Sequence, residues 1–282
     1  MNHSRARKYV KRVLPASVTR RISEALNPNN NSHHPQPKFP DVRALPSMQH
    51  GSTSLFGKEF EFVDGFSFLF LYDEIIEREI YKFSTDEPAP YIIDGGSNIG
   101  LSVLYFKRAY PKARILAFEP DPNIFEVLKR NCRRFELEEV ELFDRALWME
   151  NGSLGFREDG SLGGRLADDG NSASDAEVPT TRLRDLLNAK VTLLKLDIEG
   201  AETDVLEDCA DRLVHVENMF VEYHSFADRP QSLHRLLKVV HEAGFRTHFH
   251  VFEPSAQPLF ERTIREGIDR LDMNLDIFCF RD

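Results

Sequence analysis

Cysteine is scarce in this sequence, and no long apolar run occurs. The 282 residues include three cysteines, Cys132, Cys209 and Cys279, which are widely spaced and odd in number. They fit neither a disulfide framework nor a zinc site, so we expect a reducing compartment, the cytoplasm. No stretch reaches the roughly 18 apolar residues of a membrane-spanning helix. The N-terminus also lacks the continuous apolar region that a signal peptide requires.

Positive charge is scarce outside the N-terminus. The chain carries 36 Lys and Arg against 46 Asp and Glu, a net charge of −10. Residues 1–22 hold seven of the basic residues and no acid, so the rest of the chain carries a net charge of −17. A body this acidic repels nucleic acid, and we therefore expect no nucleic-acid partner.

Residues 1–50 have the composition of an appendage to a folded domain. Between Tyr9 and Leu26, apolar residues recur at helical spacing, with basic residues on the opposite face. Two interpretations remain open: a frayed helix that rests on the domain, and a helix that makes peripheral contact with an anionic membrane surface. The polar, proline-containing residues 27–40 are expected to form a linker.

Residues 51–90 are expected to form a hairpin and a helix that precede the main domain. Phenylalanines alternate with other residues on both sides of Asp64-Gly65, a pair typical of a two-residue hairpin turn. Residues 72–84 then place Ile75, Ile76 and Ile80 at helical spacing. This segment is interpreted as a lid or a prefix.

Residues 91–282 are expected to form the main domain, because strands and helices alternate there. The predicted strands are YIID, ARILAFEP, VELFDRALWM, VTLLKLDIE and NMFVEYHS. This alternation indicates the α/β class, with a mostly parallel sheet covered by helices on both faces. The last two strands, RTHFHVF and LDIFCF, lack a clear helix between them, which predicts one antiparallel edge strand. After Asn151-Gly152, SLGFRE is expected to pair with the preceding strand as a short hairpin.

The stretch YIIDGGSNIG, residues 91–100, ends a predicted strand in a glycine turn. A dinucleotide-binding turn needs glycine where Ser97 stands. Gly96 would let the backbone approach a ligand, and Gly100 would let the following helix pack closely. The carboxylate of Asp94 would repel a pyrophosphate and attract a cationic nucleoside such as S-adenosylmethionine. The residues assigned to the cofactor here are Asp94, Gly95, Gly96, Ser97, Asn98 and Gly100.

Acids at the ends of the next strands supply further candidates for the cofactor site. Glu119 ends the second strand nineteen residues after Gly100, near the spacing at which an acid accepts hydrogen bonds from ribose hydroxyls. Asp144 and Ala146 end the third strand, where adenine would lie. The alternative for each acid is a strand-end side chain that faces solvent.

Four segments together resemble one family. IIDGGSNIG, LAFEPDPNIFEVLKRN, LLKLDIEGAETDVLE and FVEYHS are similar to the FkbM family of S-adenosylmethionine-dependent methyltransferases, as is VPTTRLRDLL ahead of the fourth strand. The resemblance implies a class I methyltransferase fold with a seven-stranded, Rossmann-like sheet. It also implies S-adenosylmethionine as cofactor and O-methylation of a small molecule, saccharide or lipid. A nicotinamide-dependent oxidoreductase and a non-catalytic cofactor-binding scaffold are the alternatives.

The ends of the fourth and fifth strands carry the candidate catalytic residues. Asp197 and Glu199 are two residues apart, so on an extended chain they point to one side, and so do Glu222 and His224. Methyl transfer to a hydroxyl requires that the acceptor lose a proton. We expect neutral His224 to act as general base, with Glu199 or Glu222 orienting it. Glu202 is interpreted as an acid that suits a helix N-terminus.

Two features near this site stay open on the sequence alone. Asp197, Glu199, Glu222 and His224 could also hold a divalent ion, but their spacing does not demand one, so no metal is assigned. The glycine-rich loop of residues 159–178 follows the third strand on the ligand side and is a candidate lid. Its one cation, Arg165, is a candidate anchor for an anionic acceptor.

Overall fold

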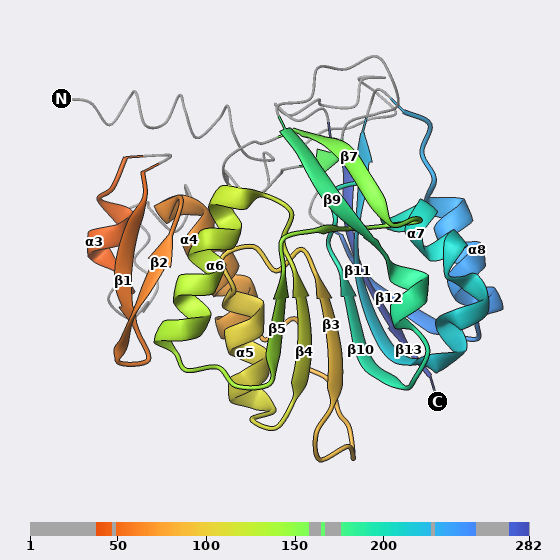
Figure 1. The fold of residues 1–282 in the computed structure, drawn as a ribbon, viewed down its shortest axis with the longest axis horizontal. Coiled ribbons are helices and arrows are strands. Elements are labelled where there is room, and N and C mark those ends of the chain that lie inside the picture. Colours follow the sequence, from red (N-terminus) through yellow and green to blue (C-terminus); the bar gives the residue numbers. More distant parts are fainter. Residues whose placement is uncertain are drawn as a thin grey trace, which may run out of the picture.

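The structure is a computed structural model that describes residues 38–46, 49–157, 165–166, 176–226, 229–251 and 271–281 (Figure 1). The basic N-terminal segment, most of the linker and most of the 159–178 loop lie outside the described residues, as does the side chain of Arg165. Their predicted roles therefore stay predictions. Among the residues that are described, no helix has the length and apolar character needed to cross a bilayer.

A seven-stranded sheet in the order β12-β13-β11-β10-β3-β4-β5 forms the centre of the molecule. Its strands are β3 (Tyr91–Gly95), β4 (Arg114–Phe118), β5 (Val140–Phe143), β10 (Val191–Leu196), β11 (Val216–Phe226), β12 (Arg246–Val251) and β13 (Leu271–Phe280). The neighbours from β11 to β5 are parallel, and β13 is antiparallel to both of its neighbours. The predicted class is confirmed, and the antiparallel strand lies one place inside the edge.

Helices cover both faces of this sheet (Figure 1). They are α5 (Leu101–Ala109) and α6 (Pro122–Arg134) on one face, and α7 (Glu202–Asp208) and α8 (Leu233–Glu242) on the other. Successive residues of β3 serve the two layers, because Ile92 packs with the first pair and Ile93 with the second. The inner strand β10 is buried along its whole length, which explains why it is apolar except for Thr192 and Lys195.

The segment before the sheet begins with helix α3 (Pro40–Arg43) and contains the hairpin at a different place from the one predicted. Strand β1 (Gly51–Leu55) pairs with β2 (Lys58–Phe62) across a turn at Phe56-Gly57. The expected turn at Asp64-Gly65 is wrong, because Asp64 instead caps helix α4 (Gly65–Leu71). Its Oδ2 accepts hydrogen bonds from the Ser67 amide at 2.8 Å and the Ser67 hydroxyl at 2.7 Å. An aspartate before a helix satisfies amides that no carbonyl of the helix can reach.

The predicted helix over residues 72–84 is confirmed in its first part. Residues Tyr72–Glu77 form a π-helix, η1, that continues α4, and no helix is assigned in residues 78–90. The whole prefix shares its apolar core with the main domain, since Phe60, Phe62 and Phe68 are buried in one cluster with Ile92. Asn131 of α6 joins them further, accepting from the Glu61 amide and donating to the Glu61 carbonyl, both at 2.9 Å.

We expect Asp64→Ala to lower the free energy of unfolding by about 1 kcal/mol, the usual contribution of an N-cap side chain. The physical reason is that the Ser67 amide, which is buried with Asp64, loses its acceptor. Urea denaturation of the full chain measures the effect. Asp86→Ala, at an exposed position outside any helix or strand, is the control and should change stability by less than about 0.5 kcal/mol. Equal losses in both variants would contradict the assigned cap.

A second, four-stranded sheet lies beyond the carboxyl ends of the parallel strands (Figure 1). In its order, β6-β9-β7-β8, the strands are β6 (Ala146–Trp148), β9 (Ala176–Arg182), β7 (Gly152–Arg157) and β8 (Arg165–Leu166). The predicted hairpin is therefore wrong: β7 pairs with β9, and β6 is parallel to β9. Beyond it, the expected short helix near residues 182–188 is found as the 3-10 turn η2 (Leu183–Leu186).

Candidate active site

The glycine turn after β3 is held between the ends of β4 and β10. The amides of Gly96 and Ser97 both donate to the carbonyl of Phe118, at 3.0 and 2.9 Å. Gly96 has φ +77°, and a Cβ at this position would lie 1.9 Å from the backbone oxygen of Asp197. The close approach that requires glycine is thus to the protein's own β10 end, a neighbour that the sequence did not reveal.

The next glycine has the packing role expected for it. Gly100 has φ +88°, and a Cβ there would lie 2.6 Å from the side chain of Leu128 in α6. Asn98 also adopts a left-handed conformation, with φ 46°, which Asn tolerates better than most residues. The turn therefore fixes β3, α5 and α6 against one another.

Asp94 does not offer a free charge to a ligand. Its carboxylate is fully buried, accepts a hydrogen bond from Ser102 Oγ at 2.6 Å and forms an ion pair with Lys195 Nζ at 3.2 Å. The prediction that Asp94 directly attracts a cationic nucleoside is therefore corrected, because an internal cation already neutralises it. Its role here is to hold the turn and the start of α5.

Lys195 is a site residue that sequence reasoning missed. Its side chain is 1% exposed, and Nζ donates to the carbonyls of Gly95 at 3.1 Å and Gly96 at 2.8 Å. It also lies 3.4 Å from Asp197 Oδ2. Burial alone would lower the pKa of Lys195, but the two aspartates raise it above its ordinary value. The available signal was a single lysine in the otherwise apolar end of VTLLKL.

Glu119 lies where a ribose-binding acid is expected, at the end of β4. It is 6% exposed, and its two oxygens accept the amides of Asn98 and Asp121, each at 2.9 Å. Burial raises the pKa of this carboxyl to about 8. Each oxygen keeps a lone pair for a further donor, so the residues present fit a ligand with two neighbouring hydroxyls.

The predicted adenine end of the site is defined by fewer protein contacts than the ribose end. Asp144 follows β5 and is exposed, whereas Ala146 is buried at the start of β6. The rings of Phe118 and Phe143 stack beside them, with centroids 4.6 Å apart. The structure thus places Asp144 at the expected strand end, and contact with adenine stays a prediction.

Asp197, Glu199, Glu222 and His224, which the sequence assigned to catalysis, come together at the ends of β10 and β11. His224 Nε2 lies 3.6 Å from Glu199 Oε2 and 3.5 Å from Glu222 Oε1. Ligand atoms of Asp197, Glu199 and His224 all lie within 4.8 Å of one another. Each carboxylate is about a fifth exposed, while the imidazole is buried. The cluster therefore has one open side.

Glu202 belongs to this cluster and is not merely an acid at a helix terminus. Its side chain is 1% exposed, and its Oε1 accepts from the amides of Ile198 at 3.2 Å and Gly200 at 3.0 Å. The same oxygen lies 3.2 Å from His224 Nδ1. Gly200, with φ +98°, makes the sharp turn into α7 that brings Glu202 inward. Glu202 thereby fixes the orientation of the imidazole.

The charges around His224 change its expected protonation. Burial alone would lower the pKa of His224, but three surrounding carboxylates raise it well above its ordinary value. These acids favour the charged imidazole, whereas the sequence predicted a neutral base, so the role of His224 as general base stays a prediction. Burial and Glu222 raise the pKa of Asp197 to about 6, which makes Asp197 the member of the cluster poised to exchange a proton near neutrality.

Strand β13 adds polar groups to the same face. Asn274 Nδ2 donates to Glu222 Oε1 at 2.8 Å, and His250 Nδ1 lies 3.1 Å from Asp276 Oδ2. Asp276 is buried, and burial together with Glu222 raises its pKa to about 9. Asn274 and Asp276 were missed because only the register of β13 with β11, which pairs Glu222 with Asp276, brings them to the site. His250 lies on the neighbouring strand β12, opposite Asp276.

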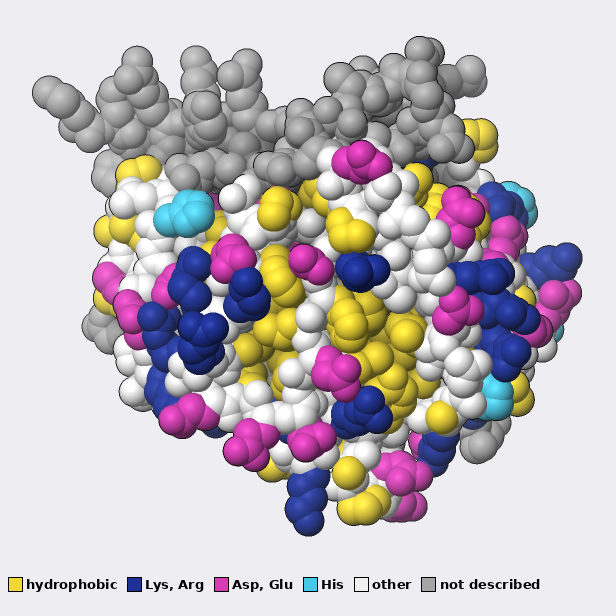
Figure 2. Space-filling view, viewed as in Figure 1, with side chains coloured by type: hydrophobic (Ala, Val, Ile, Leu, Met, Phe, Trp, Pro, Cys, Tyr) yellow, Lys and Arg dark blue, Asp and Glu magenta, His cyan; other side chains and the backbone are white. Residues whose placement is uncertain are grey.

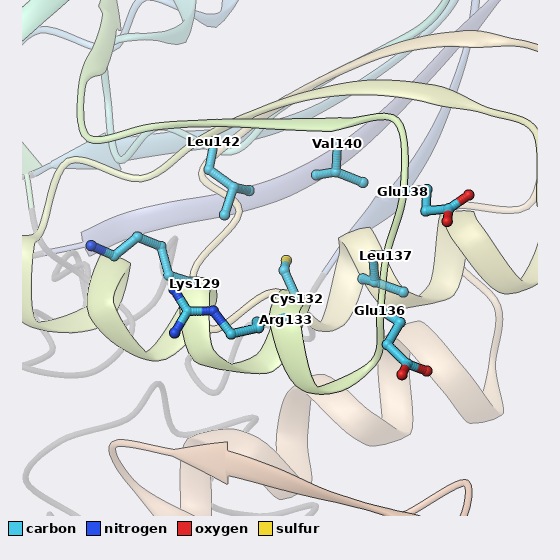
Figure 3. A pocket seen from close by; sticks show the side chains of 8 residues that line it. All are labelled: Lys129, Cys132, Arg133, Glu136, Leu137, Glu138, Val140 and Leu142. Carbon is cyan, nitrogen blue, oxygen red and sulfur yellow. The ribbon is translucent and has the colours of Figure 1, made fainter.

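Two surface features lie apart from these residues. A hollow of about 500 Å³ between α6 and β5 is lined by residues that include Cys132, Val140 and Leu142, and none of the predicted site residues lines it (Figure 3). Figure 2 shows Lys and Arg side chains on the side where α6 lies. Arg130 and Arg134 of α6 are paired with Glu61.

Comparisons with known proteins agree with this geometry. A family model described as "Methyltransferase FkbM domain" matches residues 94–247, more than half of the chain. "Methyltransferase 1" of Beauveria bassiana is 32% identical over 180 residues, 53% of this chain and 72% of its own length. "2-O-methyltransferase NoeI" of Sinorhizobium fredii is 27% identical over 169 residues, which are 52% of this chain and 68% of its own length.

A solved structure also resembles the chain. The crystal structure of "Methyltransferase FkbM" from Methylobacillus flagellatus covers 76% of this chain at 14% identity, with a TM-score of 0.46. The match spans about half of that protein's chain, 53%. The strand order of the sheet comes from the structure of this chain and does not rest on the similarity to that protein.

Proposed function

Because the chain belongs to the FkbM family of S-adenosylmethionine-dependent methyltransferases, we propose that it methylates a hydroxyl group of a saccharide, lipid or other small molecule. The observation that carries the proposal is the cluster that Asp197, Glu199 and Glu222 form with His224 beside the glycine turn. Two relatives support a hydroxyl acceptor by their names, 2-O-methyltransferase NoeI and 31-O-demethyl-FK506 methyltransferase FkbM of Streptomyces tacrolimicus. Membership of this family disfavours a nicotinamide-dependent oxidoreductase.

The residues at the ends of β3 and β4 would hold the cofactor. Glu119, which already accepts from the Asn98 amide, would accept hydrogen bonds from the ribose hydroxyls, and the Gly96 turn would fix the backbone beside them. When bound, S-adenosylmethionine would supply a sulfonium methyl group for transfer to the acceptor oxygen. Asp144 and Ala146 would lie toward the adenine.

The cluster at β10 and β11 would take the proton that the acceptor hydroxyl loses. We assign this step to Asp197, because its pKa of about 6 leaves it mostly ionised at neutral pH and its side chain is 22% exposed. When protonated, the imidazole of His224 would stabilise the ionised carboxylates around it. Lys195 holds Asp197 toward the turn.

The proposed reaction is tested by incubating the full chain with methyl-labelled S-adenosylmethionine and extracts of saccharides, lipids and polyketides. Label should enter a product that survives mild alkali, because a methyl ether resists hydrolysis and a methyl ester does not. Alkali-labile label, or label on nitrogen, would contradict O-methylation. Binding of S-adenosylhomocysteine without any transfer would favour the scaffold alternative.

Asp197→Asn should lower the rate of this transfer by roughly 30-fold. General bases usually contribute at least 100-fold, and the loss is smaller here because Glu199 can replace Asp197 in part. The matched control is Asp211→Asn, at an exposed acid paired with Arg184 outside the cluster, and it should keep the parent rate. Equal rates in both variants would remove Asp197 from the proposed role.

A further inference from the structure

We propose that Asp197, Glu199 and His224 form a binding site for one divalent cation of the Mg²⁺ and Mn²⁺ class. The sequence left such a site open without favouring it. The structure adds an observation that the sequence could not supply, namely how the two nitrogens of His224 are used.

One nitrogen of the imidazole is already committed to a buried acid. His224 Nδ1 lies 3.2 Å from Glu202 Oε1, and Glu202 is held by two backbone amides. Metal-binding histidines usually make this contact with a carboxylate, which fixes the tautomer and turns the other nitrogen toward the ion. His224 Nε2 is therefore directed away from Glu202 and toward the carboxylates of β10 and β11.

The other nitrogen, Nε2, lies near carboxylate oxygens. Its distances to them fit ligands of one common ion better than hydrogen bonds. Nε2 lies 3.6 Å from Glu199 Oε2, too far for a hydrogen bond, and 3.5 Å from Glu222 Oε1, at the limit of one. Ligands bound at about 2.1 Å to one ion are about 3.0 to 3.5 Å apart. The three candidate ligand atoms all lie within 4.8 Å of one another, so small side-chain movements bring them to that spacing.

The charge of the surrounding residues points the same way. The acids at these strand ends include Asp94, Asp197, Glu199, Glu202 and Glu222, which lie close to one lysine, Lys195, and His224 would be neutral as a metal ligand. Such an excess of closely spaced acids must be balanced by protons or by a cation. Glu202 Oε2 is also buried with no hydrogen-bond partner among the described residues. A divalent ion would neutralise this excess directly.

Three ligands from the protein and an open side are typical of catalytic ions, as distinct from structural ones. Asp197 and Glu199 are partly exposed, so an acceptor hydroxyl could reach the ion from outside. Contact with the ion would lower the pKa of that hydroxyl and ease its loss of a proton to the cluster. This role rests on the proposed function, whereas the site itself does not.

The test measures Mn²⁺ binding to the full chain after treatment with EDTA, with free Mn²⁺ followed by its paramagnetic resonance signal. We expect one Mn²⁺ per chain. Asp197→Asn and His224→Ala should weaken the affinity at least tenfold, and Glu202→Gln about tenfold, because it removes the support of the imidazole. The control Asp211→Asn should bind like the parent.

Calorimetry with S-adenosylhomocysteine on the same samples separates the two proposals and shows that each variant is folded. If the parent binds the nucleoside but no stoichiometric Mn²⁺, the metal site is wrong, while the cofactor site of the proposed function stands. Unchanged Mn²⁺ affinity in folded His224→Ala or Glu202→Gln would also overturn the site. If Mn²⁺ binds as expected and the nucleoside does not, the proposed function fails and the site remains.

Discussion

Lys195→Met is expected to lower the free energy of unfolding by about 3–5 kcal/mol, the usual cost of removing one partner from a buried ion pair. The substitution keeps the volume of the side chain and removes its charge. Asp94, which is fully buried, would then keep only Ser102 as a side-chain partner among the described residues. The carbonyls of Gly95 and Gly96 would also lose a donor. Urea denaturation of the full chain measures the loss.

Two further variants show whether the loss comes from the buried charge. In Asp94→Asn/Lys195→Met both charges are gone, so the double variant should be more stable than the sum of the two single losses predicts. Lys82→Met removes a lysine of the same type from an exposed pair with Glu79 and should cost less than about 1 kcal/mol. A loss below 1 kcal/mol in Lys195→Met would contradict the account of the glycine turn.

The alternation of strands and helices was readable from the sequence because it depends on local patterns. The apolar run before Asp94 and the acids that end β4, β10 and β11 fix which residues meet at one edge of a parallel sheet. Glu119, Asp197 and His224 were found in this way. Their positions follow from strand ends alone, without knowledge of what packs beside them.

What the sequence did not show depends on partners far along the chain. Lys195, which neutralises Asp94, lies 101 residues further along the chain. The sequence around Asp94 alone therefore suggested an unpaired charge. Asp276 reaches the site through the register of β13, and β7 finds its partner β9 across a long loop. Local patterns were also ambiguous at Asp64, where hairpin turns and helix caps favour the same residue type.

Glu119→Gln is expected to weaken the binding of S-adenosylhomocysteine by at least 100-fold. A hydrogen bond to a charged group contributes about 1.5–3 kcal/mol, and two ribose hydroxyls would each lose one. The side chain keeps its size, but its single oxygen can accept from only one of the two amides, of Asn98 and Asp121, that donate to Glu119. Glu126→Gln, at an exposed acid of α6 paired with Lys129, is the control and should bind like the parent.

The same interaction predicts how the affinity depends on pH. Burial raises the pKa of free Glu119 to about 8, so this carboxyl is largely protonated at pH 6. Hydroxyl donors favour the ionised form, so the bound state has a lower pKa and binding releases a proton. The affinity should therefore rise from pH 6 to pH 8, by up to about tenfold per unit, and level off above. Glu119→Gln cannot ionise and should lose this slope.

Calorimetric titration of the parent and Glu119→Gln with S-adenosylhomocysteine at pH 6 and pH 8 tests the central claim most directly. We predict one nucleoside bound per chain, more tightly at pH 8 than at pH 6. In the variant the affinity should be at least 100-fold weaker than that of the parent at pH 8, and nearly independent of pH. No binding to the parent, or the same affinity and the same pH dependence in both proteins, would contradict the account.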